Sequence, residues 1–341
     1  MELSSPQLPA PLPTSETATA LTLGGDATWL TVMGGVTAVE GAWWVVTWQM
    51  GIAPAPYIFT YLALAFAGLG AALTLRLWLQ PKAPHPNWSS VLPATFLVGI
   101  GASFFLPLKY AIPKLMPFWI DRPLALAERT VFTADPWLLL DRCLGWAAVP
   151  MDRLYALWLP TQALVLFLVI LQPPSAAKSR ALIAYVLAWF VLGVVAALLF
   201  SSAGPIFYDR LFGGAEFHGL RETLHRHGAW LVLAESDKMW TSLASRRPGI
   251  VAGISAVPSI HVAVSVWMYL ATRTLAPRGA GYVLAYAMAI WTASVQLGWH
   301  YVSDGLAGAL GMLAIWQSTR TILTTFGSSF DSANAKKPAT A

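Results

Sequence analysis

Long apolar stretches separated by short polar connections run through most of the chain. Eight of them come close to the roughly 20 mostly apolar residues that a helix needs to cross a bilayer. They lie at 28–50, 57–79, 91–112, 153–171, 181–201, 258–276, 281–298 and 303–323. The pattern predicts an all-α fold, a polytopic membrane helix bundle with about eight transmembrane helices.

The two ends of the chain do not share this pattern. Residues 1–26 hold several prolines and acidic residues but no Lys or Arg, so they lack the basic region that opens a signal peptide. We expect a flexible cytoplasmic tail at 1–26 and a second flexible tail at 326–341. Between the tails, the pattern predicts two N-terminal transmembrane helices in 27–89 and one larger membrane domain in 90–325.

Composition excludes the other broad classes of protein. Hydrophobic residues make up 57% of the chain and charged residues 11%, whereas a soluble domain carries about 25% charged residues. The 17 Trp and 10 Tyr are typical of chains with membrane interfaces. The net charge of +5 comes without a dense basic cluster, so no nucleic acid partner is expected. The single cysteine excludes an intramolecular disulfide.

Lys and Arg are dense in three short connections, at 76–90, 172–180 and 272–280. With eight spans, these connections and both termini fall on one side of the membrane. The positive-inside rule makes that side cytoplasmic. The long segments 113–152 and 202–257 then lie on the extracytoplasmic face of a multi-pass cell membrane protein.

Two short stretches carry the polar groups that suggest chemistry. Residues 255–261 read Ser-Ala-Val-Pro-Ser-Ile-His and enter the sixth predicted span, and residues 299–304 read Trp-His-Tyr-Val-Ser-Asp and enter the eighth. The sixth span leaves the outer face at His261, and the seventh returns to that face near Gly298. We therefore expect His261 and His300 at the same membrane level.

Each stretch alone also fits a structural role, because a helix-end His is often an interfacial residue and an Asp at a helix start favours the helix dipole. Together the two stretches indicate chemistry more specifically than either does alone. His300 and Asp304 are four apart and would share one helix face. A carboxylate that accepts from one ring nitrogen leaves the other nitrogen free as a nucleophile. His261 opposite can then protonate a leaving oxygen.

Pro258 and Ser259 suit a helix start, since Pro is favoured in the first helical position. The free backbone N–H groups at such a start bind phosphate. A nucleophilic His, an acidic His and an anion-binding helix end together predict phosphoryl transfer through a phosphohistidine.

The same residues resemble those of a known family. Pro-Ser-Ile-His at 258–261, followed by His-Tyr-Val-Ser-Asp-Gly-Leu-Ala-Gly at 300–308, resembles the type 2 phosphatidic acid phosphatase superfamily of membrane phosphatases and phosphotransferases. The inositol phosphorylceramide synthase-like (inositolphosphotransferase) branch is the most similar, and Ser-Ser-Ala-Gly-Pro at 201–205 also looks like it. The resemblance covers about residues 90–325.

The resemblance implies a fold and a set of roles. A phosphatidic acid phosphatase-like six-helix core is expected within the larger membrane domain. His300 would take the phosphoryl group, Asp304 would orient His300, and His261 would protonate the leaving group and then act as base toward the acceptor. Ser259 and nearby N–H groups would hold phosphate oxygens. No metal and no cofactor are implied.

The sequence departs from the superfamily pattern at its cations. The pattern has a lysine, six residues and then Arg-Pro. Here seven residues separate Lys114 from Arg122-Pro123. Ser294 occupies the place of an arginine ahead of the nucleophilic histidine. The candidate phosphate-binding cations are therefore Arg122, which we prefer, Lys114 and Lys109. Further cations on that side are Arg210, Arg246 and Arg247, and for each a headgroup or solvent contact is the alternative.

Three classes of function stay open at this point. The first is an enzyme acting on a membrane lipid phosphate, with a hydroxyl acceptor giving headgroup transfer and water giving phosphate release. A ceramide-like or polyprenyl lipid is the expected kind of substrate, and the branch resemblance favours transfer. The others are a transporter or channel, and a lipid-binding protein that kept the fold without catalysis. The sequence indicates no oligomeric state.

Overall fold

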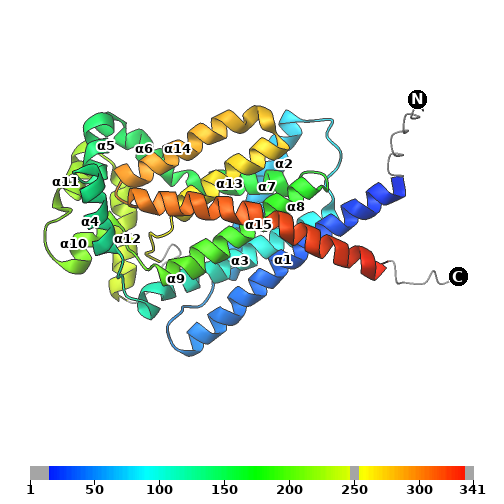
Figure 1. Cartoon of the computed structure of the whole chain (residues 1–341), viewed down its shortest axis with the longest axis horizontal. Coiled ribbons are helices and arrows are strands. Elements are labelled where there is room, and N and C mark those ends of the chain that lie inside the picture. Colours follow the sequence, from blue (N-terminus) through cyan, green and yellow to red (C-terminus); the bar gives the residue numbers. More distant parts are fainter. Residues whose placement is uncertain (1–14, 246–252, 335–341) are drawn as a thin grey trace, which may run out of the picture.

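The computed structural model describes residues 15–245 and 253–334, and every regular element in these two ranges is a helix (Figure 1). Apolar chains in lipid favour this outcome, because a helix satisfies all its backbone hydrogen bonds internally. The predicted all-α class is confirmed.

Long helices run side by side along the longest axis of the molecule (Figure 1). A helix occurs at each of the eight predicted places. These helices are α1 (Ser15–Gln49), α2 (Ile58–Leu79), α3 (Trp88–Leu115), α7 (Trp158–Ile170), α8 (Ala176–Leu187) continued by the π-helix η2 (Ala188–Ala196) and α9 (Ala197–Leu199), α13 (Ile260–Leu275), α14 (Ala280–Gln296) and α15 (Val302–Asn334).

Short helices gather at one end of this bundle, and we call them the cap. Figure 1 shows the cap on the left, while α1 begins and α15 ends at the opposite end. The cap helices come from the two long segments that the sequence placed on a single face. They are α4 (Asp121–Phe132), α5 (Pro136–Leu144), η1 (Gly145–Ala147), α6 (Ala148–Ala156), α10 (Pro205–Phe212), α11 (His218–His227) and α12 (Trp230–Ser245).

The number of helices that could cross a membrane is smaller than the eight expected. In the described residues, four helices are long and apolar enough by themselves, and a fifth span results if the pair 136–156 and 158–170, bent by 45°, counts as one. α13 has 16 residues and α14 has 17, so both fall short of about 20. α13 is short because the chain before Ile260 is not helical.

The helices extend into both segments that were expected to be tails. α1 begins at Ser15, within 1–26, and α15 ends at Asn334, within 326–341. Residues 1–14 and 335–341 lie outside the described part of the chain.

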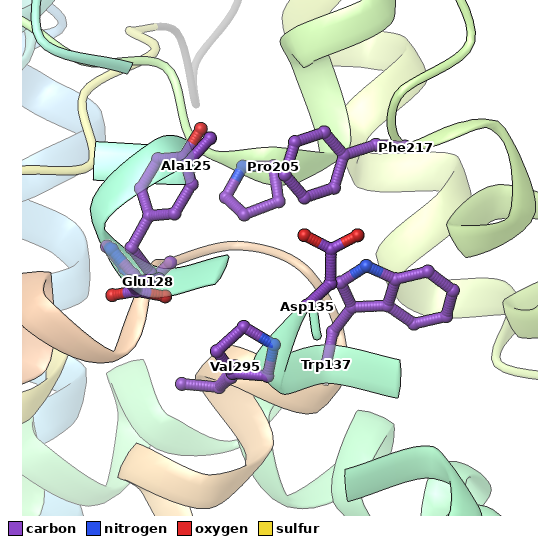
Figure 2. Close-up of a pocket in the computed structure, with 10 residues that line it drawn as sticks. Ala125, Glu128, Asp135, Trp137, Pro205, Phe217 and Val295 are labelled. Atoms are coloured by element: carbon purple, nitrogen blue, oxygen red, sulfur yellow. The ribbon is translucent and has the colours of Figure 1, made fainter. Parts of the chain in front are cut away.

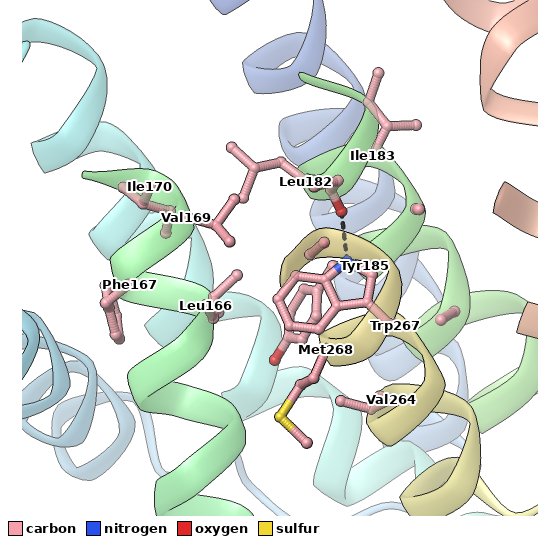
Figure 3. Packing of buried hydrophobic residues seen from close by; sticks show 14 of the residues in the cluster. Leu166, Phe167, Val169, Ile170, Leu182, Ile183, Tyr185, Val264, Trp267 and Met268 are labelled. Carbon is pink, nitrogen blue, oxygen red and sulfur yellow. Dashed lines mark hydrogen bonds between the residues drawn. The ribbon is translucent and has the colours of Figure 1, made fainter. Parts of the chain in front are cut away.

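α13 is the central helix, packed against α7, α8, α14 and α15. Its Trp267 is fully buried and donates its indole N–H to the Ala181 carbonyl at 2.7 Å, as Figure 3 shows. A buried indole N–H needs such a partner. The bond therefore fixes α13 against α8 and so sets where the start of α13 lies.

A buried polar cluster ties α1 to the bundle at the end far from the cap. Lys178 at the start of α8 has 0% of its side chain exposed, and its ammonium lies 3.7 Å from Asp26. It also donates to the Gln172 carbonyl at 3.1 Å, and Asp26 accepts from the Trp29 indole at 2.8 Å. Lys178, which the orientation argument treated as a loop charge, is thus an interior ion-pair partner.

α15 approaches the start of α13 at Gly308. A Cβ at Gly308 would collide with the Ser259 carbonyl oxygen just before α13. The contact requires glycine because no side chain fits between the two backbones. It places residues 300–304 beside residues 259–261.

We predict that Gly308→Ala destabilises the protein by about 1–3 kcal/mol, because α15 must move away from the start of α13 to admit the methyl group. Gly70→Ala on α2 is the matched control, since its Cβ would meet no atom within 4 Å and Ala is the better helix former. Thermal unfolding of both purified variants in detergent measures the difference. Equal stability of the two variants would contradict the close approach.

Candidate active site

The start of α13 and the connection between α14 and α15 meet at the cap end of the bundle. They bring His261 and His300, 39 positions apart in the sequence, to a ring centroid separation of 5.8 Å with an interplanar angle of 59°. Two imidazoles at this separation are close enough to act on one small group between them.

Asp304 lies against His300 from the first turn of α15. Its Oδ2 is 3.4 Å from Nδ1 of His300 and accepts the Tyr301 backbone N–H at 2.9 Å. α15 begins at Val302, so His300 precedes the helix and the expectation of a shared helix face is wrong. The contact forms because the chain bends at 299–301 and turns the ring back over the first turn.

Burial controls the protonation of His300. Only 5% of the residue is exposed, and this desolvation lowers the pKa of His300 to about 3. The positive charge of Lys109 also lowers the pKa, whereas a backbone hydrogen bond with Ala256 raises it. The imidazole is therefore neutral at physiological pH. A neutral imidazole with Nδ1 toward a carboxylate presents Nε2 as its nucleophilic atom.

Ser259 links the two motifs. Its backbone N–H donates to the Asp304 carbonyl at 2.9 Å, and its hydroxyl accepts the Val262 N–H at 3.4 Å as the N-cap of α13. The sequence suggested that Pro258 is the first helical residue, but the helix begins at Ile260. Because the Ser259 oxygen is an acceptor in this cap, its O–H proton is available to a ligand.

His261 is held between two aromatic rings that sequence reasoning missed. Tyr155 at the end of α6 stacks on it at 4.6 Å and 23°, and Trp158 at the start of α7 lies 4.2 Å away at 45°. Trp158 is fixed by its indole N–H, which donates to Ser265 Oγ at 3.1 Å. The signal in the sequence was a pair of aromatic residues three apart at the start of the predicted span 153–171.

A family model described as the PAP2 superfamily matches residues 124–317, more than half of the chain. The chain belongs to the PAP2 superfamily. Members of this superfamily are generally phosphatases or phosphotransferases, which supports activity on a lipid phosphate in general terms. No curated protein and no solved structure matches the chain.

The two candidate lysines, Lys109 and Lys114, lie in different surroundings. The charge of Lys109 acts on His300, and a Cβ at Gly253 would press against the Lys109 side chain. Lys114 instead lies 4.0 Å from the Tyr110 ring centroid and donates to the Ile52 carbonyl at 3.0 Å. Of these two lysines, Lys109 is the one whose charge acts on the histidines.

The arginine candidates lie in other surroundings. Arg122 is exposed on α4, with its guanidinium 4.9 Å from the Phe212 ring centroid. Arg210 pairs with Asp237 at 2.6 Å, and Arg246 and Arg247 lie outside the described residues. Arg122 therefore forms no contact with the histidines in this conformation.

Ser294, the residue at which the resemblance would place an arginine, forms hydrogen bonds with the backbone. It is fully buried, its hydroxyl donates to the Trp291 carbonyl at 2.7 Å, and its carbonyl accepts the His300 N–H at 3.1 Å. The residue positions the His300 backbone and brings no charge to the site.

Asp121 was also missed, and it anchors the turn that supports both motifs. Its buried carboxylate accepts the Ser202 hydroxyl at 2.9 Å and the Ala203 and Gly204 N–H groups at 3.0 and 2.9 Å. Gly204 has φ +91° and packs against the Trp299 carbonyl. The Ser202 carbonyl accepts the Ala256 N–H at 2.8 Å. One carboxylate thus holds a turn that touches the chain on both sides of the site.

A narrow pocket opens beside His300 and is lined by cap residues that include Glu128, Asp135, Trp137 and Phe217. Figure 2 shows the Asp135 carboxylate next to Trp137, with Glu128 on the opposite wall. Glu128 accepts the Ser303 N–H and hydroxyl, both at 2.7 Å. Glu128 repels an anion, whereas the charge of Asp135 is balanced by Arg129 at 2.6 Å. A phosphate is therefore favoured between His300 and His261 rather than against Glu128.

We predict that Asp121→Asn lowers the stability by about 2–4 kcal/mol. In the asparagine, an amide nitrogen takes the place of Oδ2, which accepts the Ala203 N–H at 3.0 Å. The nitrogen cannot accept that bond and adds a second buried donor facing the first, which is costly. The neighbouring Arg122→Gln, at an exposed position, is expected to change stability by less than about 1 kcal/mol. Thermal unfolding in detergent tests both, and a mild Asp121→Asn effect would show that the turn does not depend on this carboxylate.

Proposed function

We propose that this PAP2-superfamily protein moves a phosphoryl group from a lipid phosphate ester through a phosphohistidine on His300. The observation that carries the proposal is the constellation of His261, His300 and Asp304, with 5.8 Å between the imidazole centroids and 3.4 Å between Nδ1 of His300 and the carboxylate. Such a pair supplies a nucleophile and a general acid to the same phosphorus.

In the first step, Nε2 of neutral His300 attacks phosphorus and the bond from phosphorus to the leaving oxygen breaks. His261 acts in the imidazolium form, which a bound phosphate anion favours; it gives that oxygen a proton and becomes neutral. Asp304 stabilises the positive charge that develops on the His300 ring. In the second step, His261 takes the proton of an acceptor O–H while that oxygen attacks phosphorus. His300 is then released neutral.

Lys109 and the Ser259 hydroxyl are the groups we assign to the phosphate oxygens. The Lys109 charge acts on His300, and the Ser259 cap leaves a proton to donate. Arg122 and Lys114 would need to leave their present partners to reach the same group. We therefore place Lys109 ahead of Arg122, the cation that the sequence favoured.

We infer that the acceptor is a hydroxyl-bearing lipid or headgroup, as in the inositol phosphorylceramide synthase-like branch that the sequence resembles. The acid His261 contacts Tyr155 and Trp158, and Tyr155 in turn lies parallel to Trp299. Aromatic walls of this kind favour an amphipathic alcohol over bulk water. Release of free phosphate by water is the alternative.

The cap lies opposite the end where α1 begins and α15 ends (Figure 1), and this separation supports an active site on the extracytoplasmic face.

Turnover of labelled phospholipids, with and without a hydroxyl acceptor, tests this function. A new phosphodiester indicates headgroup transfer, and free phosphate indicates a phosphatase. No product, together with no binding of orthovanadate, would reject the enzyme and favour a lipid-binding protein or a transporter.

We predict that His300→Ala lowers turnover by roughly 10³-fold or more while the protein remains folded, because the nucleophile is lost from a short connection. His218→Ala is the matched control, since its side chain is 69% exposed on the cap and contacts only Glu222. Initial rates with the same labelled lipid measure both variants, and a parent-like rate for His300→Ala would exclude the phosphohistidine.

We predict that His261→Ala slows phosphohistidine formation most for substrates with a poor leaving group. An alkoxide needs a proton as it departs, whereas an aryl oxide departs without one. Rates of leaving-group release should fall about 10²–10⁴-fold for an alkyl ester and far less for an aryl ester. Equal losses for the two esters would remove His261 from the role of general acid.

A further inference from the structure

Tyr155 occupies a position between the two histidine motifs. Its ring stacks on His261 at 4.6 Å on the α13 side and lies parallel to Trp299, the neighbour of His300, at 6.2 Å and 10°. It also packs against both large apolar clusters, the one inside the bundle and the one under the cap. The ring is therefore fixed by its surroundings, and its hydroxyl has a defined position.

That hydroxyl oxygen is buried and has no hydrogen-bond partner among the described residues. A buried hydroxyl left without a partner costs free energy, so such groups are rare unless they serve a ligand. The hydroxyl lies close enough to Asp304 for an electrostatic interaction. Nδ1 of His261 and Oδ1 of Asp304 are likewise buried without partners in the described chain. Three such atoms thus belong to one small region.

The site also needs a donor that the superfamily pattern would have supplied as an arginine. A phosphoryl group in transfer carries charge on three equatorial oxygens. Ser294 stands in the arginine position and donates to the backbone, which leaves Lys109 and Ser259 as the assigned donors. A phenol O–H is neutral at physiological pH and donates one hydrogen bond, so Tyr155 can fill the third place.

We propose that the Tyr155 hydroxyl donates a hydrogen bond to a non-bridging oxygen of the phosphoryl group bound between His261 and His300, which makes Tyr155 a further catalytic residue. This inference rests on the proposed function. The competing explanation is that Tyr155 acts only through its ring, as a wall that holds His261. Removing the Tyr155 hydroxyl oxygen while keeping the ring distinguishes these two explanations.

The experiment compares Tyr155→Phe, which keeps the stacked ring, with Tyr155→Leu, which removes it. Tyr185→Phe is the matched control, because Tyr185 is a buried tyrosine in the bundle whose hydroxyl donates to Gln162 at 2.8 Å. Each variant is assayed for kcat, KM and orthovanadate affinity beside the parent and His300→Ala, and thermal unfolding checks the fold. Vanadate gives a readout that needs no knowledge of the lipid.

We expect Tyr155→Phe to lower kcat/KM by about 10–100-fold, the worth of a hydrogen bond to a charged group, mostly through kcat because the oxygen gains charge in the transition state. Orthovanadate affinity should fall by a similar factor, while Tyr185→Phe retains both values. Parent-like kcat/KM and vanadate affinity in Tyr155→Phe, with losses in Tyr155→Leu alone, would reject the proposed hydrogen bond. The role of Tyr155 would then be limited to the packing of its ring against His261.

Failure of the proposed function has a different signature. If His300→Ala matches the parent in turnover or vanadate binding, the phosphohistidine is excluded and the Tyr155 proposal falls with it. If His300→Ala loses both and Tyr155→Phe loses neither, the mechanism stands and only the Tyr155 contact is rejected.

Discussion

The site depends on how closely α15 can approach the start of α13. At Gly308 the backbones meet without an intervening side chain, and the Ser259 N–H reaches the Asp304 carbonyl at 2.9 Å. This one contact brings together two motifs that lie far apart in the sequence. Tyr155 and the turn held by Asp121 both depend on this approach, since each contacts the chain on both sides of it.

Charge is distributed unevenly around His300. Glu128 and Asp135 lie on the cap side, where Arg129 pairs with Asp135 at 2.6 Å, whereas the positive charge of Lys109 acts on the ring. Ser294 brings no charge to the site. In the proposed mechanism, the neutral hydroxyl donors Ser259 and Tyr155 therefore share the phosphate contacts with Lys109.

Sequence reasoning recovered the helical class, the superfamily and the pairing of His261 with His300, because apolar length and short motifs are local properties. It placed α14 closely, but it started α13 two residues too early, since hydropathy does not report where a loop replaces the first turn. It also missed Asp121 and Tyr155. Their importance comes from partners more than 80 positions away in the chain, and no local pattern encodes such contacts.

The ion pair between Asp26 and Lys178 has a consequence for biogenesis. Asp26, the first residue of the candidate span Asp26–Gln49, is synthesised long before α8 and its lysine. A carboxylate that is buried without its cation is unfavourable. The start of α1 therefore gains its full packing stability only once Lys178 has been made.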